Sequence, residues 1–319
     1  MAVYTDVAFE DLESLLAGYD IGEPLSFKGI AEGVENSNFH LQTDRGGYIL
    51  TLYEKRVSRK DLPYFIGLMQ HLAARGIPCP LPVRNKKGEQ LIELNGRPAA
   101  ILTFLNGLSL RRPDAAQCAA VGASLAKLHA AGKDFPLFRA NSLSIEGWSE
   151  LVAATEAKAD SVQDGLRNLI ATAYEDVKGN WPHSLPSGVI HADLFPDNVL
   201  FVNDQISGVI DFYFACNDAF AYDLAVVLNA WCFESDGGFN ITKGKSLITA
   251  YRRNRVLTPE EITALPLLMR GAALRFLLTR LYDWLNHDSK ALVRPKDPRE
   301  FARRLRFHQK VKRAAEYGL

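Results

Sequence analysis

Three polar side chains in the stretch 189–217 have types and a spacing that suit phosphoryl transfer. Asn198 follows Asp193 after four residues, and Asp211 ends the next apolar run. A carboxylate and an amide oxygen suit a hard cation such as Mg²⁺, which keeps waters that nucleotide phosphates can replace. The remaining carboxylate, Asp193, is then placed to orient an attacking hydroxyl and to accept its proton late in a loose transition state.

Local sequence patterns predict a hairpin that brings these side chains together. The runs 199–202 and 206–210 are apolar and of strand length, and residues 203–204 between them are typical of a turn. Such a hairpin would place Asn198, at the start of its first strand, beside Asp211, at the end of its second strand. The loop before the hairpin holds the other aspartate.

The order and spacing of these residues match one known pattern, His191-x-Asp193-x4-Asn198 followed by Ile210-Asp211-Phe212. The pattern resembles the catalytic loop and metal-binding Asp of the aminoglycoside-phosphotransferase group of small-molecule kinases, which are relatives of the protein kinases. The resemblance implies that Asp193 is catalytic, that Asn198 and Asp211 hold Mg²⁺, and that His191 braces the loop. An ordinary buried histidine is the alternative for His191. Ala192, in the middle of the motif, disfavours a protein kinase.

Composition indicates a globular protein with no strong electrostatic preference. The 319 residues are 47% hydrophobic and 23% charged, and both Lys plus Arg and Asp plus Glu total 37. This balance does not favour nucleic acid or an anionic membrane as a partner. No signal peptide is predicted, and Asp223 and Asn229 interrupt the apolar stretch 219–233, so no membrane span is expected. The cysteines have no paired spacing and fit free thiols in a reducing cytoplasm; they are Cys79, Cys118, Cys216 and Cys232.

The expected fold class is α+β, in a bilobed, protein-kinase-like arrangement. Residues 1–104 are predicted as an N-terminal nucleotide-binding lobe with an antiparallel sheet, and residues 105–319 as a larger, mostly helical catalytic and substrate-binding lobe. The small lobe is predicted to have five strands, at 25–31, 37–43, 48–53, 89–94 and 97–104. Helices are expected elsewhere, at 5–19, 58–75, 113–131, 146–177, 219–233, 243–255, 259–286 and 298–317.

Four residues of the first hairpin are candidates to bind ATP. Gly29 and Gly33 would let backbone N–H groups approach phosphate oxygens, and Asn36 and Ser37 could add donors. An ordinary hairpin turn is the alternative from the residues alone. The position favours nucleotide binding, because the resembled family folds its N-terminal hairpin over ATP. Phe104 lies where a linker would seat adenine, although a plain turn explains it equally well.

The third strand lacks the basic residue that kinases of this type usually place against the nucleotide phosphates. Thr51 stands at the equivalent position, and the following helix, 58–75, contains no Glu to pair with a lysine. Another cation must therefore neutralise the phosphates. Lys55 and Lys28 are the candidates.

The substrate site is expected among charged residues of the C-terminal half. Arg275 lies in an apolar helix without a local acid, so it is a candidate to bind a substrate carboxylate bidentately. Asp218 or Asp223 would take an ammonium group, although Asp223 could instead brace the catalytic loop, and Tyr213 lines the same region. Arg280 and Asp283, elsewhere on the helix, are expected to pair with each other.

Longer runs resemble the bacterial homoserine kinases of the aminoglycoside-phosphotransferase type: EGVENSNF, YILTLYEKR, HADLFPDNVLF, GVIDFYFACNDAFAYDLAVVLNAWC and RGAALRFLLTRLYDW. The resemblance implies ATP- and Mg²⁺-dependent phosphorylation of L-homoserine to O-phospho-L-homoserine in threonine biosynthesis, by a cytoplasmic monomer or homodimer.

Other functions stay open. A choline or ethanolamine kinase would cage its cation with aromatics, for which Tyr213, Phe214, Trp231 and Trp284 are available. An aminoglycoside kinase would need an acidic groove, which the balanced charge does not favour. A non-catalytic nucleotide-binding module would explain the missing third-strand lysine, but the intact Asp193, Asn198 and Asp211 argue against it.

Overall fold

The computed structural model describes residues 5–30, 36–54, 57–287 and 294–319. The chain divides into two compact units, which are described separately. The first unit comprises Met1–Asn106 with Lys290–Arg294, and the second comprises Gly107–Ser289 with Pro295–Leu319.

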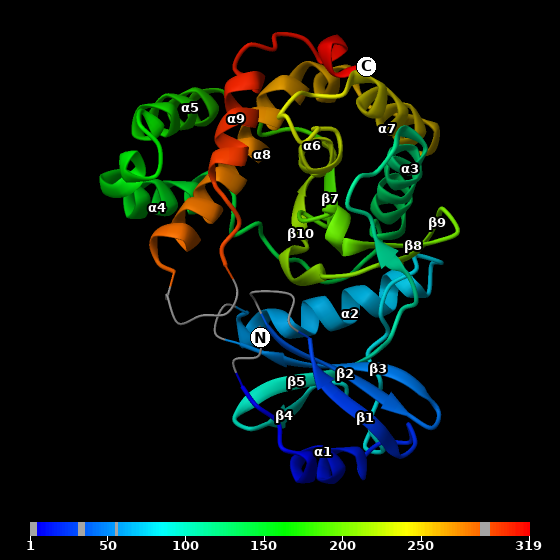
Figure 1. The fold of residues 1–319 in the computed structure, drawn as a ribbon. Coiled ribbons are helices and arrows are strands. Elements are labelled where there is room, and N and C mark those ends of the chain that lie inside the picture. Colours follow the sequence, from blue (N-terminus) through cyan, green and yellow to red (C-terminus); the bar gives the residue numbers. More distant parts are fainter. Residues whose placement is uncertain (1–4, 31–35, 55–56, 288–293) are drawn as a thin grey trace. The chain divides into compact units, whose positions relative to one another are not determined.

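The first unit is built on a five-stranded antiparallel sheet in the order β1-β2-β3-β5-β4. Its elements are α1 (Phe9–Leu16), β1 (Pro24–Gly29), β2 (Asn36–Thr43), β3 (Gly46–Tyr53), η1 (Arg59–Asp61), α2 (Leu62–Ala73), β4 (Ile92–Leu94) and β5 (Arg97–Thr103). The predicted small-lobe sheet is therefore confirmed. In Figure 1, α1 lies below this sheet and α2 above it.

In the first unit a tight turn joins β4 and β5, and an amphipathic helix covers the sheet. Asn95 and Gly96 both have positive φ, 50° and 71°, as a two-residue hairpin turn requires. Leu12 and Leu16 of α1 pack against Leu41 and Leu50 of the sheet. The predicted helix start at Thr5-Asp6 is wrong, because α1 begins at Phe9 and its N-cap, Ala8, offers no side-chain acceptor.

The second unit is mostly helical, with two short antiparallel sheets, β10-β7 and β6-β8-β9. Its strands are β6 (Leu108–Ser109), β7 (Ser187–Ile190), β8 (Val199–Val202), β9 (Gln205–Val209) and β10 (Cys216–Ala219). Its α-helices are α3 (Ala115–Ala131), α4 (Ile145–Thr155), α5 (Leu166–Asn180), α6 (Phe220–Trp231), α7 (Ile241–Asn254), α8 (Pro259–Leu285) and α9 (Arg299–His308). Single 3₁₀ turns complete it, at η2 (Glu156–Ser161), η3 (Pro196–Asn198), η4 (Phe212–Phe214) and η5 (Ala314–Tyr317).

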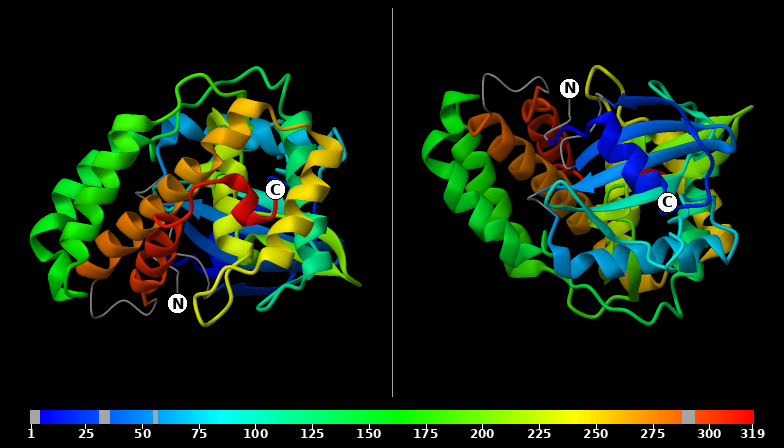
Figure 2. Two further views of the ribbon diagram at one scale, coloured as in Figure 1. Left: turned by 90° about the horizontal axis from the view of Figure 1, so that it is seen from above. Right: turned by 90° about the horizontal axis from the view of Figure 1, so that it is seen from below.

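Two long helices predicted for the second unit are broken in the structure. The expected helix 146–177 divides into α4 and α5: α4 ends at Thr155, η2 follows it, and Gly165, with φ 71°, is the residue before α5. Figure 2 shows the two resulting helices beside α8. The expected helix 298–317 ends at His308, and the chain makes only the 3₁₀ turn η5 after it.

Helix α8 is the central helix of the second unit, and its bounds agree with the predicted helix 259–286. Thr258 and Glu261 form a reciprocal capping box, and Pro259 occupies the first helical turn, where its missing N–H costs nothing. Length and composition alone would let α8 cross a membrane, but 67% of its apolar window is buried within the protein. It also carries the guanidinium groups of Arg275 and Arg280 in its apolar body.

Helices α3 and α7 pack very closely against each other. A Cβ at Gly122 of α3 would lie 2.2 Å from the carbonyl oxygen of Leu247 in α7, so only glycine permits this approach.

All four cysteines are buried free thiols, as the sequence predicts. Cys79 belongs to the first unit and the other three to the second.

Candidate active site

The catalytic segment lies between β7 and the β8–β9 hairpin. In the hairpin, Val199 pairs with Val209, and the N–H of Ile210 donates to the carbonyl of Asn198 at 3.0 Å. The predicted hairpin is therefore present, and it places Asn198 and Asp211 at one end of the same strand pair. The apolar strands are buried at this end, so both polar residues are held on a rigid support.

Asn198 is bound to the loop that carries Asp193. Its Nδ2 donates to the carbonyl oxygen of Asp193 at 2.8 Å and to the Oδ2 of the same residue at 3.2 Å. Because the amide nitrogen is committed to these acceptors, Oδ1 is the atom that a cation would use.

The donor set fits Mg²⁺ bound together with a nucleotide. Among the described residues, no group of three or more His, Cys, Asp or Glu side chains could hold a metal ion by itself. Asn198 and Asp211 supply one amide and one carboxylate group, and Mg²⁺ commonly takes few protein ligands and completes its shell with phosphates and waters. Asp211 has φ 65°, which is unusual for a residue with a Cβ and typical of functional sites.

Asp193 lies in an environment that strongly perturbs its titration. Burial raises the pKa of its carboxyl to about 8, and the nearby charge of Asp211 also raises it, whereas the charges of Arg275 and Lys296 lower it. Perturbed carboxyl groups of this kind cluster at catalytic sites. The two cations only partly offset this rise, and it is the ionised form of the carboxyl that can accept a proton.

His191 holds the loop from the inside. It is fully buried, its Nε2 lies 3.1 Å from the carbonyl oxygen of Ile210, and its Nδ1 accepts from the backbone N–H of Asp193 at 3.3 Å. These contacts require Nε2 to carry the proton. Burial lowers the pKa of the imidazole, so the ring is neutral and positions the loop.

Asp223 is a brace for the loop, which corrects its assignment to the substrate. Its two carboxylate oxygens accept from the backbone N–H groups of His191 and Ala192, each at 2.8 Å, and His129 Nε2 lies 3.0 Å from one of them. The residue is fully buried. Its hydrogen bonds to His129 and the nearby imidazoles lower the pKa of this carboxyl against the opposing effect of burial. An ammonium group from a substrate could not reach it.

Arg275 also serves the loop, which corrects the expectation of an open fork for a carboxylate. Only 2% of the residue is exposed, and its guanidinium donates to the carbonyl of Ala192. The same group stacks 4.4 Å from the ring centroid of Phe276 and 5.4 Å from that of Phe214. Arg275 and Ala192 are 83 residues apart, so the local sequence around either residue does not indicate their contact.

Asp218 and Tyr213 are half-buried and remain candidates for the substrate site. Asp218 accepts from Asn141 Nδ2 at 2.7 Å and from the backbone N–H of Ala219 at 2.7 Å. A carboxylate has further lone pairs, so these contacts leave room for a ligand ammonium. Burial raises the pKa of the Asp218 carboxyl, and its hydrogen bonds oppose that shift.

Trp231 does not belong to an aromatic cage. It is fully buried and donates from Nε1 to the carbonyl of Leu194 at 2.8 Å. Arg280 binds Glu300 of α9 at 2.6 Å, a partner that the local sequence did not indicate.

The structure corrects one of the nucleotide-binding expectations in the first unit. Asn36 and Ser37 are buried, and both face Glu54: Asn36 accepts from its backbone N–H at 3.4 Å, and Ser37 donates to its carboxylate at 2.7 Å. Glu54 is further paired with Arg97 at 3.2 Å. The hydroxyl of Ser37 therefore donates within the hairpin, whereas the contact of Asn36 uses its acceptor oxygen only.

Two of the other nucleotide-binding candidates, Gly29 and Phe104, lie among the described residues. Gly29 lies in β1, opposite Phe39. The side chain of Phe104 is 40% exposed and edge-on to His40, with ring centroids 5.0 Å apart, while its N–H donates to Gly47. Gly33 and Lys55 lie outside the described residues.

Comparisons with known proteins decide the family. Residues 26–257 match the model of the phosphotransferase enzyme family. A homoserine kinase of Xanthobacter autotrophicus is 61% identical over 319 residues, covering 100% of this chain and 99% of that protein. A homoserine kinase of Rhodopseudomonas palustris is 60% identical over 320 residues, covering 100% and 98%.

The chain belongs to the homoserine kinases of the phosphotransferase enzyme family. Solved structures of two other kinases share its fold. An amicoumacin kinase in complex with AMP-PNP, Ca²⁺ and Ami has a TM-score of 0.71 at 15% identity, covering 96% of this chain and 93% of that one. A microcompartment-associated aminopropanol kinase has a TM-score of 0.66 at 17% identity, covering 98% and 99%. The predicted protein-kinase-like α+β fold is thus confirmed, and this family member is a phosphotransferase.

Sequence patterns did not indicate one residue near the catalytic loop. Lys296 precedes α9 and pairs with Asp197, with Nζ and Oδ2 2.8 Å apart. It lies 99 residues from its partner and outside the family match, which ends at residue 257. An isolated lysine in a polar segment carries no sequence signal for such a contact.

Proposed function

We propose that this protein transfers the γ-phosphoryl group of ATP to the side-chain hydroxyl of L-homoserine, giving O-phospho-L-homoserine for threonine biosynthesis. The substrate follows from the full-length relatives, which are homoserine kinases at 60–61% identity. The loop carrying Asp193, Asn198 and Asp211 supplies residues suited to that reaction.

Asp193 orients the acceptor hydroxyl and takes its proton. In a loose transition state the proton leaves late, so holding the hydroxyl in line with the phosphoryl group is the larger part of this role. Asn198 is bound to Asp193 through Nδ2, so it fixes the position of the Asp193 carboxylate relative to its own Oδ1, the proposed metal ligand. His191, Asp223 and Arg275 fix the backbone that carries them.

Asn198 Oδ1 and the Asp211 carboxylate would hold Mg²⁺. When bound, the ion neutralises phosphate charge and aligns the triphosphate. Asp218 is the residue we assign to the substrate ammonium, with Asn141 setting the orientation of its carboxylate. The buried free thiols fit a cytoplasmic enzyme.

Turnover with competing acceptors tests the function. ADP release would be measured with ATP and Mg²⁺ against L-homoserine, choline and kanamycin in parallel, and the product would be identified by ³¹P NMR. We expect turnover with homoserine alone. Preferential turnover of choline or kanamycin would contradict the proposed substrate. An absence of turnover with all three would favour a non-catalytic nucleotide-binding module.

The assignment of Asp218 has its own test. Asp218→Asn removes the charge and keeps an acceptor oxygen for only one of the two donors, Asn141 and Ala219, so it should raise KM for homoserine and leave KM for ATP unchanged. Equal effects on both constants would remove Asp218 from the substrate site.

A further inference from the structure

Phosphoryl transfer needs positive charge near the transferring group, and β3 does not supply it. Negative charge spreads over the equatorial oxygens in the transition state, and fixed cations stabilise it. Thr51, at the centre of β3, is neutral and buried, and its hydroxyl donates to Asn38 Oδ1 at 2.8 Å. Besides Mg²⁺, a cation from outside β3 would therefore act on the phosphates.

Two cations of the second unit contact the catalytic loop. Arg275 binds the carbonyl of Ala192, and Lys296 pairs with Asp197. Arg275 is enclosed, hydrogen-bonded to Ala192 and stacked on Phe276, so its guanidinium has no freedom to follow a reacting group. The side chain of Lys296 is 60% exposed.

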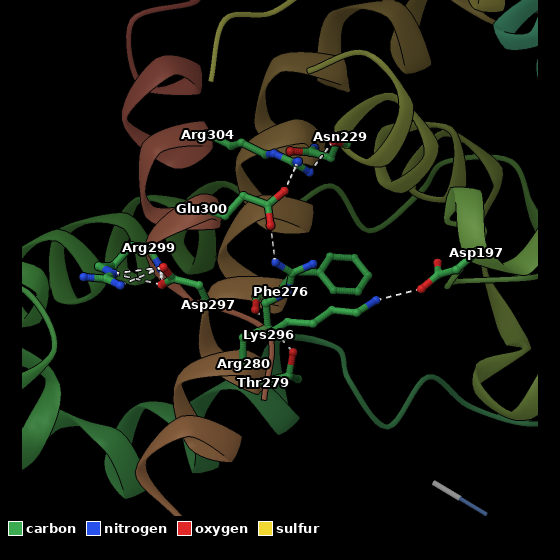
Figure 3. A network of polar contacts seen from close by, with 10 residues as sticks. All are labelled: Asp197, Asn229, Phe276, Thr279, Arg280, Lys296, Asp297, Arg299, Glu300 and Arg304. Atoms are coloured by element: carbon green, nitrogen blue, oxygen red, sulfur yellow. Dashed lines mark hydrogen bonds and ion pairs between the residues drawn. The ribbon is translucent and has the colours of Figure 1, made fainter. Parts of the chain in front are cut away.

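We propose that Lys296 is a catalytic residue that binds the transferring phosphoryl group. Its Nζ lies 2.8 Å from Oδ2 of Asp197, the residue directly before the metal ligand Asn198. Nζ also lies 5.7 Å from the ring centroid of Phe195, so the ammonium reaches along the catalytic loop. Figure 3 shows the side chain extended from the α9 side of the unit toward Asp197. The proposal rests on the kinase function proposed above.

The ion pair with Asp197 is suited to exchange. Both side chains are mostly exposed, 60% for Lys296 and 56% for Asp197, and exposed ion pairs contribute little net stability. A phosphoryl group carries more negative charge than a carboxylate and offers several acceptor oxygens. Lys296 has three N–H donors on a flexible stem, so it can bind such a group while it keeps or releases Asp197.

The backbone that carries Lys296 is anchored, although its side chain is mostly exposed. Glu300, one turn further along the chain, accepts from Arg280 of α8 at 2.6 Å and also pairs with Arg304. Arg304 in turn donates to the carbonyl of Asn229 in α6. Figure 3 shows this chain of contacts joining the helices. The lysine is therefore held within reach of the loop by contacts in which its own ammonium takes no part.

Three variants separate a phosphoryl-binding role from a structural one. Lys296→Met should lower kcat by about 100-fold, the usual effect of removing one donor to a developing charge, with little change in KM for homoserine. Lys296→Arg should recover most of the activity because it keeps the charge. Asp197→Asn removes the resting partner only, so it should keep near-normal turnover. Thermal melting should be similar for all four proteins, since the pair is exposed.

Nucleotide affinity gives a readout that does not depend on turnover. With Mg²⁺ present, Lys296→Met should bind AMP-PNP about 10-fold more weakly than the native protein, as expected for one lost charged contact, and should bind ADP equally well. Isothermal titration calorimetry measures both. This comparison holds even if homoserine is not the acceptor, so its failure is distinct from failure of the proposed substrate.

Other results would overturn the proposal. If Asp197→Asn reproduced the loss seen in Lys296→Met, the lysine would act by supporting the loop. If Lys296→Met raised KM for homoserine while AMP-PNP affinity stayed unchanged, the ammonium would bind the substrate carboxylate instead.

Discussion

The guanidinium of Arg275 donates to the carbonyl oxygen of Ala192, the residue between His191 and Asp193. Ala192 has φ 63°, in the left-handed region that costs a residue with a Cβ roughly 1–2 kcal/mol. Its N–H is bound from the other side by Asp223 at 2.8 Å. Two oppositely charged, buried side chains therefore hold one unfavourable backbone conformation, and the direction of the Asp193 carboxylate depends on both.

Arg275→Lys should lower kcat by roughly 10- to 100-fold and leave KM for homoserine little changed, because a displaced loop misplaces the catalytic carboxylate. Lysine lacks the planar fork that donates to Ala192 while stacking on Phe276. Steady-state kinetics with both substrates varied would measure the effect. Arg280→Lys is the control, since it sits on the same helix and keeps a charge for Glu300. A raised KM at unchanged kcat would return Arg275 to the substrate site.

Ala192→Gly should raise the free energy of unfolding by about 1 kcal/mol, because glycine adopts positive φ without the steric cost that alanine bears. Thermal melting followed by tryptophan fluorescence would detect the shift. Ala126→Gly, a buried position within α3, is the matched control and should lower stability by a similar amount. If both substitutions destabilised equally, the conformation of Ala192 would carry no strain.

Asp193→Asn should lower kcat by about 10²- to 10⁴-fold and leave ATP affinity nearly intact, because the amide cannot accept the hydroxyl proton. The contrasting variant is Asp211→Asn, which removes a metal-ligand charge and should weaken binding of Mg·ATP itself. Kinetics together with nucleotide titration at varied Mg²⁺ would separate them. Near-normal turnover in Asp193→Asn would contradict the assigned role.

Acid should destabilise the fold through its buried neutral histidines. Burial, aided by the charges of Arg304 and Arg270, lowers the pKa of His308 to about 3. In the unfolded chain the pKa is about 6.5, so between these values only the unfolded state binds the proton. Stability is therefore full above the unfolded value and falls as the pH drops toward 3, by about 2 kcal/mol between pH 7 and pH 5 for this residue.

His308→Gln tests the effect of pH by removing the titrating group. Glutamine retains a donor for Asn229 Oδ1, which lies 3.0 Å from Nε2 of the histidine. The melting temperature of the variant should fall less between pH 7 and pH 5 than that of the native protein. Equal falls would show that His308 does not contribute to the acid sensitivity.

The parts of the site that could be predicted are those encoded by short spacing. Asn198 and Asp211 flank two apolar runs joined by a turn, so a hairpin alone brings them to one end, and its register then follows from the alternation of buried residues. The five-stranded sheet was predictable for the same reason, since turn residues such as Asn95 and Gly96 separate its strands. The capping box of Thr258 and Glu261, with Pro259 in the first turn, is also a local pattern that marks the start of α8.

The parts that could not be predicted depend on contacts between distant elements. Arg275 and Asp223 both read as charged residues in apolar helices, a pattern shared by substrate ligands and by braces, and only their contacts with Ala192 distinguish the two. Ser37 looked like a phosphate donor until its partner, Glu54, was located. The break between α4 and α5 was not predicted, because no glycine or proline stands near Thr155, where α4 ends, and a later single glycine such as Gly165 is often tolerated within a helical pattern.

The buried cysteines make native thiol labelling a built-in probe of opening. Burial raises the pKa of the Cys79 thiol, and of the Cys216 thiol, to about 12, so reactive thiolate is scarce while each surrounding core is closed. A maleimide dye would therefore modify Cys79 only when the first unit opens, and Cys118, Cys216 or Cys232 only when the second does. Mass spectrometry of the labelled peptides could then time the two events separately without any engineered reporter.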